Sequence, residues 1–565
     1  MTLSTATTRQ LLQDVGFIFF LLLSSKAQCE ARLTSGNVAE TVNNELRLPT
    51  FLDSHMVLQR APLSARIWGW AAPNANVSAT LDASGTVSTA KTAFSIADEH
   101  GEFIIHLPPQ PAGSGYTIHV TDGTNSIDLE DIAFGDVYLC SGQSNMQFSM
   151  VSSFNASAEI ADSINYPNLR LATAERVVAD TPQSDVPSKA NYTWSRSSPE
   201  AMDTKDPFGY VSATCYFFGR ELYKALNSEV PIGLLTSCWG GQKVETFSSP
   251  DALADKTCGG TRPFNKNEQD NNGDSFSTDV NPQAMQLWNA MIHPFINMRF
   301  TGAVWYQGEA NADNAASYAC RFPAMITDWR EKFDLPDLSF FFVQLAAFSD
   351  ARWPNFRSAQ LAAAQLPKVG YVTAIDLGDP SSPHGAIHPR RKQEVGRRLS
   401  LSARSIQYEE REGLVYAGPT LAGVQFTHGT SNEESTTFIR LSFVPGTADN
   451  LHTMQAPECD KCCSELPFQV LDITGKWVTV NNGVVINSEM HLSTNTSAIL
   501  GVRYAWEAYP QCLMYNGQGG ADDHTGIAAA PFEWCAYPSG KPSWTGEACN
   551  IPGSNAAPED PFEVL

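Results

Sequence analysis

A serine in a predicted strand-to-helix turn is the sharpest chemical feature of the sequence. The apolar strand Val137–Cys140 runs directly into a Ser-Gly-Gln-Ser turn that presents Ser144 before a helix-like stretch. A serine in such a turn exposes its Oγ and lies beside backbone amides that could bind an oxyanion. The nucleophile elbow of α/β-hydrolases requires glycine two residues later, and Met146 stands there, which disfavours that family. A Gly-Gln-Ser-Asn turn alone is usually only a turn, so Ser144 becomes a candidate nucleophile only with partners.

Two other predicted strand ends carry groups that could serve an oxyanion. Trp239-Gly-Gly241 follows one buried strand, and Gln307-Gly-Glu-Ala-Asn311 follows another. Parallel sheets deliver their ligands at the carboxyl ends of the strands. The backbone N–H groups of Ser144 and Gly241 and the side-chain amide of Asn311 would provide three donors. Each feature alone is better explained as a turn or a helix cap, but their recurrence at successive strand ends favours an oxyanion site.

A nucleophilic serine needs a base, and one loop combines imidazoles with carboxylates. This loop follows the last predicted strand and contains Asp376, Asp379, His384 and His388. A histidine would accept the Ser144 proton, and a carboxylate would hold its tautomer. Pro389 restricts the backbone of the residue before it and could fix the His388 imidazole, so His388 is the candidate base and His384 its rival. Either histidine could instead be an ordinary surface-loop residue.

Strands alternate with helices in the middle of the chain, which predicts a parallel sheet covered by helices. The expected strands are Val137–Cys140, Gly233–Ser237, Gly302–Tyr306, Ser339–Leu345 and Tyr371–Ile375, and the expected helices are Tyr216–Leu226, Ala284–Ile296, Ala316–Phe333 and Arg390–Ser402.

Short apolar runs separated by turns flank this α/β region on both sides. They are Ala65–Trp70, Phe103–Leu107 and Tyr116–Val120 before it, and Val424–Thr427, Thr437–Leu441 and Val478–Val480 after it. The first set predicts a small β-sandwich. The expected organisation is a signal peptide (1–29), an N-terminal β domain (47–130), an α/β domain (131–405), a C-terminal β region (406–537) and an extended tail (538–565), with a long surface loop near 255–279.

The bulk composition excludes some functions. The chain has 565 residues, 42% of them hydrophobic and 17% charged, which is a globular composition. Its formal net charge of −23 repels phosphate backbones, so nucleic acid is not an expected partner. The same acidity suits work in a mildly acidic compartment, although simple solubility explains it equally well.

Several features predict the secretory pathway. The apolar run Val15–Leu23 followed by small residues is typical of a signal peptide and too short to span a bilayer. No later segment predicts a transmembrane helix. The 12 cysteines suit an oxidising compartment. The cluster Cys459, Cys462 and Cys463 lacks zinc-finger partners, so disulfides are favoured over a metal site. Four N-x-Ser/Thr sequons are candidate glycosylation sites: Asn76, Asn155, Asn191 and Asn495.

The order and spacing of several longer motifs resemble the sialate O-acetylesterase family, a branch of the SGNH hydrolases. The resemblance covers residues 48 to 535, nearly the whole mature chain. Its landmarks are His55–Arg60, Gly135–Met146, Ser237–Gly241, Met291–Pro294, Trp305–Asn311, Ile387–Pro389 and Tyr504–Trp506. It implies an SGNH-type three-layer sandwich with a parallel sheet at 131–405, flanked by β-sandwich-like regions.

The resemblance also implies residue roles. Ser144 would attack the acetyl carbonyl, His388 would be the base, and Gly241 and Asn311 would complete the oxyanion hole. Gln143, Gln307 and Glu309 would support the site. The family typically shows Asp-Ile-His-Pro around the base, and this chain has Ala386 instead of that aspartate. The third triad member is therefore Asp376 or Asp379, or else a backbone carbonyl orients the imidazole of a Ser–His pair.

The implied reaction is hydrolysis of sugar O-acetyl esters through an acetyl-enzyme, which needs no metal or organic cofactor. O-acetylated sialic acid is the implied substrate, and its carboxylate would call for an arginine such as Arg503 or Arg357. Acetylated xylan is the alternative substrate. A carbohydrate-binding protein with a decayed esterase core is the alternative of another class. The sequence leaves the oligomeric state, the acetyl position and the choice between lysosome and exterior open.

Overall fold

A mixed parallel and antiparallel sheet occupies the centre of the chain. In this computed structural model, seven strands follow one another in an 11-stranded sheet. Their order is β13 (Val369–Thr373), β12 (Ser339–Gln344), β11 (Gly302–Tyr306), β7 (Ser126–Gly142), β10 (Ile232–Cys238), β8 (Leu169–Thr173) and β9 (Ser195–Arg196). All neighbours along this path are parallel except β8 and β9. The predicted parallel arrangement is confirmed for the five strands expected from the sequence.

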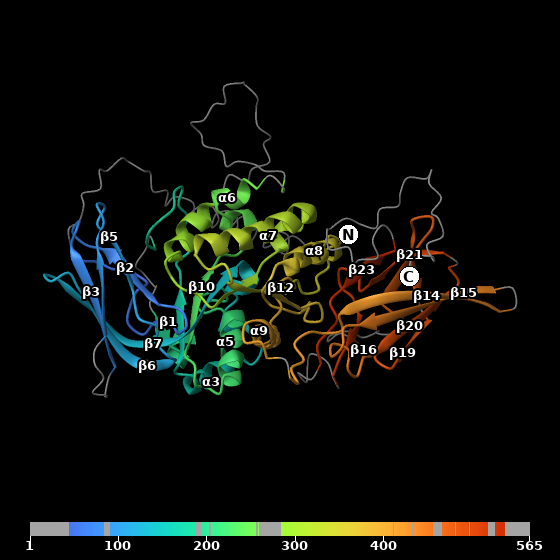
Figure 1. The fold of residues 1–565 in the computed structure, drawn as a ribbon. Coiled ribbons are helices and arrows are strands. Elements are labelled where there is room, and N and C mark those ends of the chain that lie inside the picture. Colours follow the sequence, from blue (N-terminus) through green and yellow to red (C-terminus); the bar gives the residue numbers. More distant parts are fainter. Residues whose placement is uncertain are drawn as a thin grey trace, which may run out of the picture. The chain divides into compact units, whose positions relative to one another are not determined.

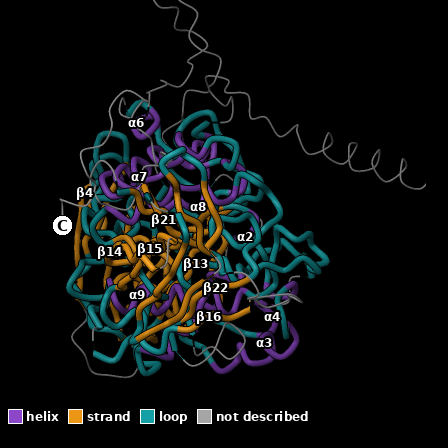
Figure 2. The backbone as a smooth tube through the Cα atoms, turned by 90° about the vertical axis from the view of Figure 1, so that its right-hand side faces the viewer, coloured by secondary structure: helices purple, strands orange, loops and turns teal. Residues whose placement is uncertain are grey.

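Helices cover both faces of this sheet, because its strands are apolar on both sides. In β12, Phe340 and Phe342 contact Phe322 of helix α7 (Ala315–Lys332), with ring centroids 5.8 and 5.3 Å apart. Phe341 points to the opposite face and lies 6.5 Å from Phe218 of helix α5 (Ala213–Ala225). Such continuous burial is typical of strands enclosed by helices rather than strands with one wet face. Figure 1 shows α6 and α7 on one side of the strands and α5 and α9 on the other, and Figure 2 shows α7 and α9 on opposite sides.

The helices largely match their sequence signals. Helix α5 begins at an N-cap, Ser212, whose side chain accepts a hydrogen bond from the Cys215 N–H. The remaining α-helices are α2 (Ser144–Gln147), α3 (Ala156–Asp162), α4 (Pro199–Met202), α6 (Pro250–Leu253), α8 (Trp353–Gln360) and α9 (Lys392–Ile406). The helix expected over 284–296 is instead a π-helical turn, Trp288–Ile292, followed by a 3-10 turn, His293–Phe295. Pro294 lacks an N–H and interrupts the i→i−4 ladder there.

One long strand joins the central sheet to the N-terminal β-strands. The first half of β7 pairs with β6 (Gly113–Thr121) and β1 (Val57–Gln59), and its second half lies inside the parallel sheet. The domain boundary expected between residues 130 and 131 therefore falls within a single strand. The other strands of this part are β2 (Arg66–Trp70), β3 (Asn76–Ala83), β4 (Lys91–Ile96) and β5 (Glu102–His106), and β2 and β5 form a separate antiparallel pair.

The C-terminal part is all β and has its own apolar core. Its sheets have the orders β14-β15-β20-β19, β16-β22 and β18-β17-β21-β23. The bounds are β14 (Leu421–Ser431), β15 (Glu434–Phe443), β16 (His452–Gln455), β17 (Phe468–Asp472), β18 (Trp477–Val480), β19 (Asn482–Ile486), β20 (Glu489–Thr494), β21 (Ile499–Tyr504), β22 (Cys512–Tyr515) and β23 (Phe532–Cys535). Ile375, which follows β13, packs in this second core, so the two parts share a hydrophobic contact close to the candidate histidine loop.

The structure describes residues 45–83, 91–186, 194–202, 205–255, 258, 284–410, 412–431, 434–455, 466–480, 482–496, 498–517 and 526–536. The expected signal peptide, Asn191, the cluster Cys459–Cys463, nearly all of the 255–279 segment and the tail 538–565 lie outside them. Within the described ranges no helix is both long and apolar enough to cross a bilayer.

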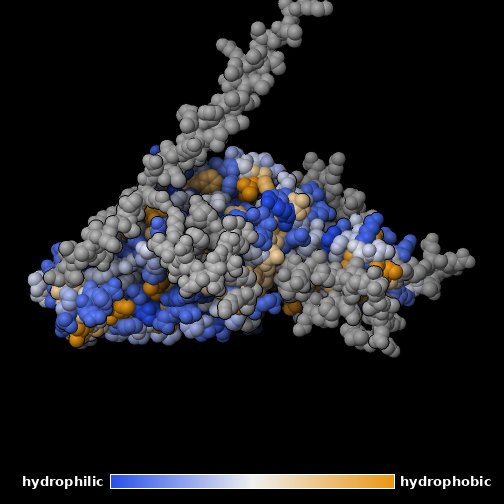
Figure 3. Space-filling view, turned by 90° about the horizontal axis from the view of Figure 1, so that it is seen from above, coloured by the Kyte–Doolittle hydropathy of each residue, from blue (hydrophilic) through white to orange (hydrophobic). Residues whose placement is uncertain are grey.

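Features of the described residues agree with an oxidising compartment. Disulfides join Cys140 to Cys215 and Cys258 to Cys320, and Cys512 and Cys535 are also disulfide-bonded. The sequon residues Asn76, Asn155 and Asn495 are exposed. The described residues visible in Figure 3 are mostly hydrophilic with scattered apolar patches.

Candidate active site

Three chemically marked strand ends lie in register at one edge of the parallel sheet. Gly142 of β7 is the register partner of Cys238 in β10 and of Tyr306 in β11. The ladder continues past the strands, because the Gln143 N–H donates to the Tyr306 carbonyl and the Trp239 N–H donates to the Gly142 carbonyl, both at 3.0 Å. The turns that carry Ser144, Gly241 and Asn311 therefore leave the sheet side by side, as their positions after successive strands predicted.

Gly142 makes the sharp exit from β7 possible. Its φ of 135° lies in a region that favours glycine, and a Cβ at this position would lie 2.2 Å from the Tyr306 carbonyl oxygen. The chain can thus pass directly from a buried strand into helix α2, whose first residue is Ser144. The half-buried Ser144 stands where strand and helix meet.

The structure brings the predicted nucleophile and base together. His388 Nε2 lies 2.9 Å from Ser144 Oγ, although the two residues are 244 positions apart in the sequence. His388 comes from the loop between β13 and α9, which the parallel topology returns to the same edge of the sheet. A serine hydroxyl at this distance from an imidazole nitrogen can pass its proton to it. His384, the rival, instead lies edge-on to the Phe148 ring, with centroids 5.4 Å apart.

The expectation that Asp376 or Asp379 holds the base needs correction. His388 Nδ1 donates to the carbonyl of His384 at 2.7 Å, so a backbone oxygen fixes the tautomer that leaves Nε2 free to accept the serine proton. Among the described residues no carboxylate is hydrogen-bonded to this imidazole. The alternative of a Ser–His pair oriented by a backbone carbonyl is the one the geometry matches.

Asp376 and Asp379 each form an ion pair with an arginine, and neither is hydrogen-bonded to the histidine. Arg398 grips Asp376 with two hydrogen bonds of 2.7 Å, and both side chains are fully buried. Arg390 makes the corresponding pair with Asp379, at 2.6 and 2.9 Å, and holds the pKa of that carboxyl below its usual value despite burial. A bidentate guanidinium uses the lone pairs that a triad acid would offer to imidazole.

The surroundings of His388 favour its neutral form. Burial lowers the pKa of the imidazole below its ordinary value, and the charge of Lys392 adds to this effect. Phe208 closes one side, with its ring centroid 5.1 Å from that of His388. A neutral imidazole is the state that can act as a general base.

The candidate oxyanion donors Gly241 and Asn311 differ in their exposure. Gly241 is exposed with a φ of 75°, and open space surrounds the position of its absent Cβ. Asn311 is 3% exposed, and its Oδ1 accepts from the Val244 N–H, so its NH₂ group is turned outward from that bond. One of the two N–H bonds of this amide meets Glu245 Oε2 at 2.9 Å, which leaves the second available to a ligand.

The three expected supporting residues tie the turns to one another. Gln143 Oε1 accepts from the N–H groups of Gly308 and Ala310, at 3.4 and 3.2 Å. Gln307 Nε2 donates to Asn311 Oδ1 at 2.7 Å and to the Gln242 carbonyl at 3.1 Å. Glu309 Oε1 accepts from Asn145 at 2.5 Å, and burial raises the pKa of the Glu309 carboxyl.

Sequence reasoning missed several residues of this edge. Asn145, Lys392 and Glu245 make buried contacts to the predicted groups, and Gln147 Oε1 accepts from the Gly240 N–H at 2.7 Å. Asn145 stands inside the Gly-Gln-Ser-Asn motif, and that position was the one available signal for it. Nothing in the sequence near Lys392 or Glu245 distinguishes them from ordinary surface charges.

The two arginines considered for a substrate carboxylate differ in access. Arg357 is fully buried and donates to four backbone carbonyls, those of Leu345, Ala346, Glu507 and Ala508, so it is a structural clamp and not a ligand group. Arg503 is half-buried, donates to Gln469 and lies 4.2 Å from the Trp477 ring centroid.

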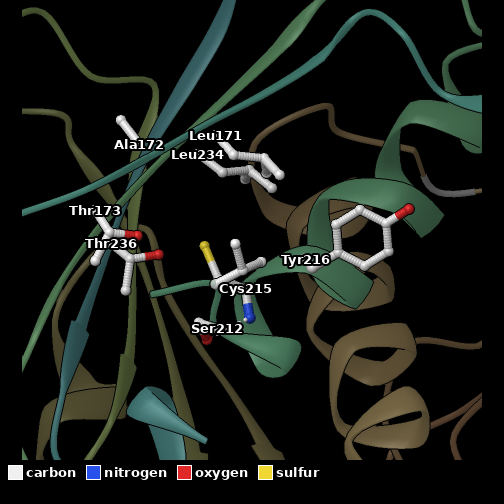
Figure 4. Close-up of a pocket in the computed structure, with 9 residues that line it drawn as sticks. Leu171, Ala172, Thr173, Ser212, Cys215, Tyr216, Leu234 and Thr236 are labelled. Carbon is white, nitrogen blue, oxygen red and sulfur yellow. Dashed lines mark hydrogen bonds between the residues drawn. The ribbon is translucent and has the colours of Figure 1, made fainter. Parts of the chain in front are cut away.

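A small hollow beneath helix α5 belongs to packing and not to this site. Figure 4 shows Cys215 of α5 facing Leu171 of β8 and Leu234 of β10 across it. Its volume of about 10 Å³ is near the minimum for a single water molecule and far below that of a sugar.

Comparisons with known proteins show which family the chain resembles. A family model described as carbohydrate esterase, sialic acid-specific acetylesterase, matches residues 134–403. Sialate O-acetylesterase from Mus musculus is 33% identical over 533 residues, which cover 86% of this chain and 94% of the mouse protein. The Homo sapiens protein of the same name is 32% identical over 503 residues, covering 83% and 90%.

A solved structure extends the likeness to the fold. The crystal structure of a carbohydrate acetylesterase from Xanthomonas citri superposes with a TM-score of 0.68 at 27% identity, covering 86% of this chain and 99% of that one. The match covers most of this chain and nearly all of the Xanthomonas citri chain. The chain belongs to the sialate O-acetylesterase family of carbohydrate esterases.

Proposed function

We propose that this chain hydrolyses O-acetyl esters of sugars, with O-acetylated sialic acid as substrate, and that Ser144 and His388 carry the reaction. The observation that supports this most is the 2.9 Å contact between Ser144 Oγ and His388 Nε2 at the edge of the sheet. Family membership supplies the substrate class, because the relatives are named sialate O-acetylesterases. A hydroxyl and a neutral imidazole at this distance are the minimal parts of a serine esterase.

The proposed cycle has two steps. His388 Nε2 takes the proton of Ser144 Oγ as this oxygen adds to the acetyl carbonyl, and the imidazolium then protonates the departing sugar hydroxyl. Water attacks the acetyl-enzyme in the same manner and releases acetate. The Ser144 and Gly241 backbone N–H groups and the free N–H of Asn311 would receive the oxyanion, and each such donor is worth about 3 kcal/mol of transition-state stabilisation.

The carbonyl of His384 takes the orienting role in this proposal. It holds Nδ1–H, so the imidazole keeps the tautomer with Nε2 free to accept the serine proton. A neutral carbonyl stabilises the imidazolium less than a carboxylate would, because it offers a dipole and not a charge. An acetyl ester with a sugar hydroxyl as leaving group is a far less demanding substrate than an amide, so this weaker partner suffices.

The regions receive corresponding roles. Residues 131–405 would form an SGNH-type three-layer catalytic domain, 47–130 the N-terminal β domain, and 406–537 a C-terminal β region that packs against the histidine loop through Ile375. The disulfides, the exposed sequon residues Asn76, Asn155 and Asn495 and the apolar segment near residue 20 support the secretory pathway, with the lysosome or the exterior as destination.

Acetate release from three substrates tests the proposal. The purified wild-type protein is assayed with O-acetylated sialic acid, acetylated xylan and p-nitrophenyl acetate. The variants Ser144→Ala and His388→Ala are assayed in the same way, with His100→Ala as a control because the His100 side chain is 77% exposed. Faster release from the sialic acid than from xylan, lost in the first two variants and kept in the control, is expected. Faster release from acetylated xylan would make xylan, and not sialic acid, the substrate. Absence of turnover on all three would favour a carbohydrate-binding role.

A further inference from the structure

A buried asparagine next to the nucleophile bridges the two segments that carry Ser144 and His388. Asn145 is 1% exposed, and all three of its side-chain partners come from distant parts of the chain. Its Oδ1 accepts from Lys392 Nζ at 2.6 Å. Its Nδ2 donates to Glu309 Oε1 at 2.5 Å and to the Ile387 carbonyl at 2.9 Å.

These partners permit only one orientation of the amide. Lys392 is a pure donor and Glu309 and the Ile387 carbonyl are acceptors, so a flipped amide would set NH₂ against the ammonium and oxygen against two oxygens. The backbone of Asn145 is also held, because its carbonyl accepts from Thr214 Oγ1 at 3.1 Å. Asn145 is therefore a rigid connection and not an adaptable one.

The bridge acts on the distance that the proposed chemistry needs. Asn145 follows Ser144 directly, and Ile387 directly precedes His388. A bond from the Asn145 amide to the Ile387 carbonyl thus ties the start of α2 to the backbone of the histidine loop. Because Nδ1 of His388 meets a carbonyl of the same loop, the placement of the whole loop decides where the imidazole lies.

The burial of Lys392 is energetically unfavourable, which suggests that its contacts have a functional role. It is fully buried, and burial lowers its pKa to about 7. It is the first residue of helix α9, where the helix dipole opposes a cation. Its Nζ lies 4.8 and 5.1 Å from the ring centroids of Phe148 and Tyr306, which compensate in part. The contribution of Lys392 to the site is its hydrogen bond to Asn145 Oδ1.

We propose that Asn145, oriented by Lys392 and Glu309, is the positioning residue that holds the His388 loop against Ser144, in the part that an aspartate bonded to the histidine plays in a catalytic triad. This deepens the proposed function and rests on it. Lys392 has a second effect, since its charge disfavours the imidazolium of His388. The other titratable or charged groups around His388 and Lys392 are His384, Asp379, Arg390 and Glu309.

Asn145→Ala is the direct test, with Asn289→Ala as the matched control. Asn289 is 3% exposed and donates to the Ala179 carbonyl, with no hydrogen bond to the described segments of Ser144 or His388, so it too is a buried asparagine that loses a bond. Turnover of p-nitrophenyl acetate is measured per titrated active serine. We expect kcat to fall about 10- to 100-fold in Asn145→Ala with little change in KM, as for a base displaced by about an ångström, and to stay near wild type in the control.

Two further variants decide the matter if Asn145→Ala does not fold. Glu309→Leu removes an acceptor that orients the Asn145 amide and should lower kcat with little change in KM. Lys392→Met should lower kcat and also move the acid limb of the kcat/KM profile to higher pH, because the charge that lowers the His388 pKa is gone. A residue with only a structural role would scale the profile without moving it.

The outcomes separate this proposal from the proposed function. A wild-type kcat in Asn145→Ala, or in Lys392→Met if the first variant does not fold, would overturn the positioning role. An unmoved pH profile in Lys392→Met would overturn the effect of the Lys392 charge on His388. Either result leaves the esterase intact. A wild-type protein without any esterase activity would instead remove the function on which the inference rests.

Discussion

Replacing Asp376 with asparagine distinguishes a triad acid from a structural ion pair. Asp376 is 1% exposed and accepts two hydrogen bonds from Arg398 and one, at 3.1 Å, from the Tyr515 hydroxyl. Asparagine has almost the same shape, but its NH₂ group would face a guanidinium N–H. The substitution therefore breaks a buried pair and leaves His388, which Asp376 does not touch, in place.

The magnitude follows from what Arg398 retains. Removing one partner of a buried salt bridge costs about 3–5 kcal/mol, because the other charge remains buried. Arg398 still donates to Glu394 Oε1 at 2.7 Å and to the Thr373 carbonyl at 2.8 Å. We therefore expect the lower end of the range, about 3 kcal/mol of lost stability. Loss of a triad acid, by contrast, lowers kcat about 10⁴-fold.

The assay measures both quantities on the same preparation. A thermal melt gives the midpoint, and p-nitrophenyl acetate turnover well below that midpoint gives kcat per titrated serine. The expected result is a clearly lower midpoint with kcat changed by no more than about threefold, far from the loss typical of a triad. A thousandfold loss of kcat at an unchanged midpoint would refute the reasoning and restore Asp376 as the acid. Asp379→Asn, measured in parallel, extends the test to the second candidate.

Three other outcomes are expected. His384→Ala should keep most activity, because only its backbone carbonyl holds His388, whereas His388→Ala should lose about 10⁴-fold in p-nitrophenyl acetate turnover; comparable losses would contradict this assignment of the base. Burial lowers the pKa of His388, so the base stays neutral and kcat/KM persists to a lower pH than an ordinary histidine allows. An acid limb of the kcat/KM profile with its midpoint above pH 6.5 would contradict this. Gly142→Ala would place a Cβ 2.2 Å from the Tyr306 carbonyl at a strained φ, so a melt should show loss of more than about 3 kcal/mol, and a wild-type midpoint would argue against the described turn.

The sequence was sufficient for the groups that local patterns reveal. Continuous apolar runs predicted five parallel strands, because strands buried on both faces need apolar residues at every position. The polar turns after three of them predicted Ser144, Gly241 and Asn311, since register at the carboxyl edge brings such turns together. The His-Pro pair in the last loop predicted His388, and the structure places its Nε2 2.9 Å from Ser144 Oγ.

Only the tertiary structure decided which partner holds the base. From the sequence, Asp376 and Asp379 looked equally able to orient His388. In the structure they form ion pairs with Arg398 and Arg390 instead. The same holds for Asn145, Glu309 and Lys392, whose three-way contact joins segments up to 247 residues apart. Competition between acceptors for one donor depends on distances across the fold, and no pattern along the chain encodes them. Local patterns along the chain therefore predicted the elements and the Ser144–His388 pair, while long-range packing determined which group holds the imidazole.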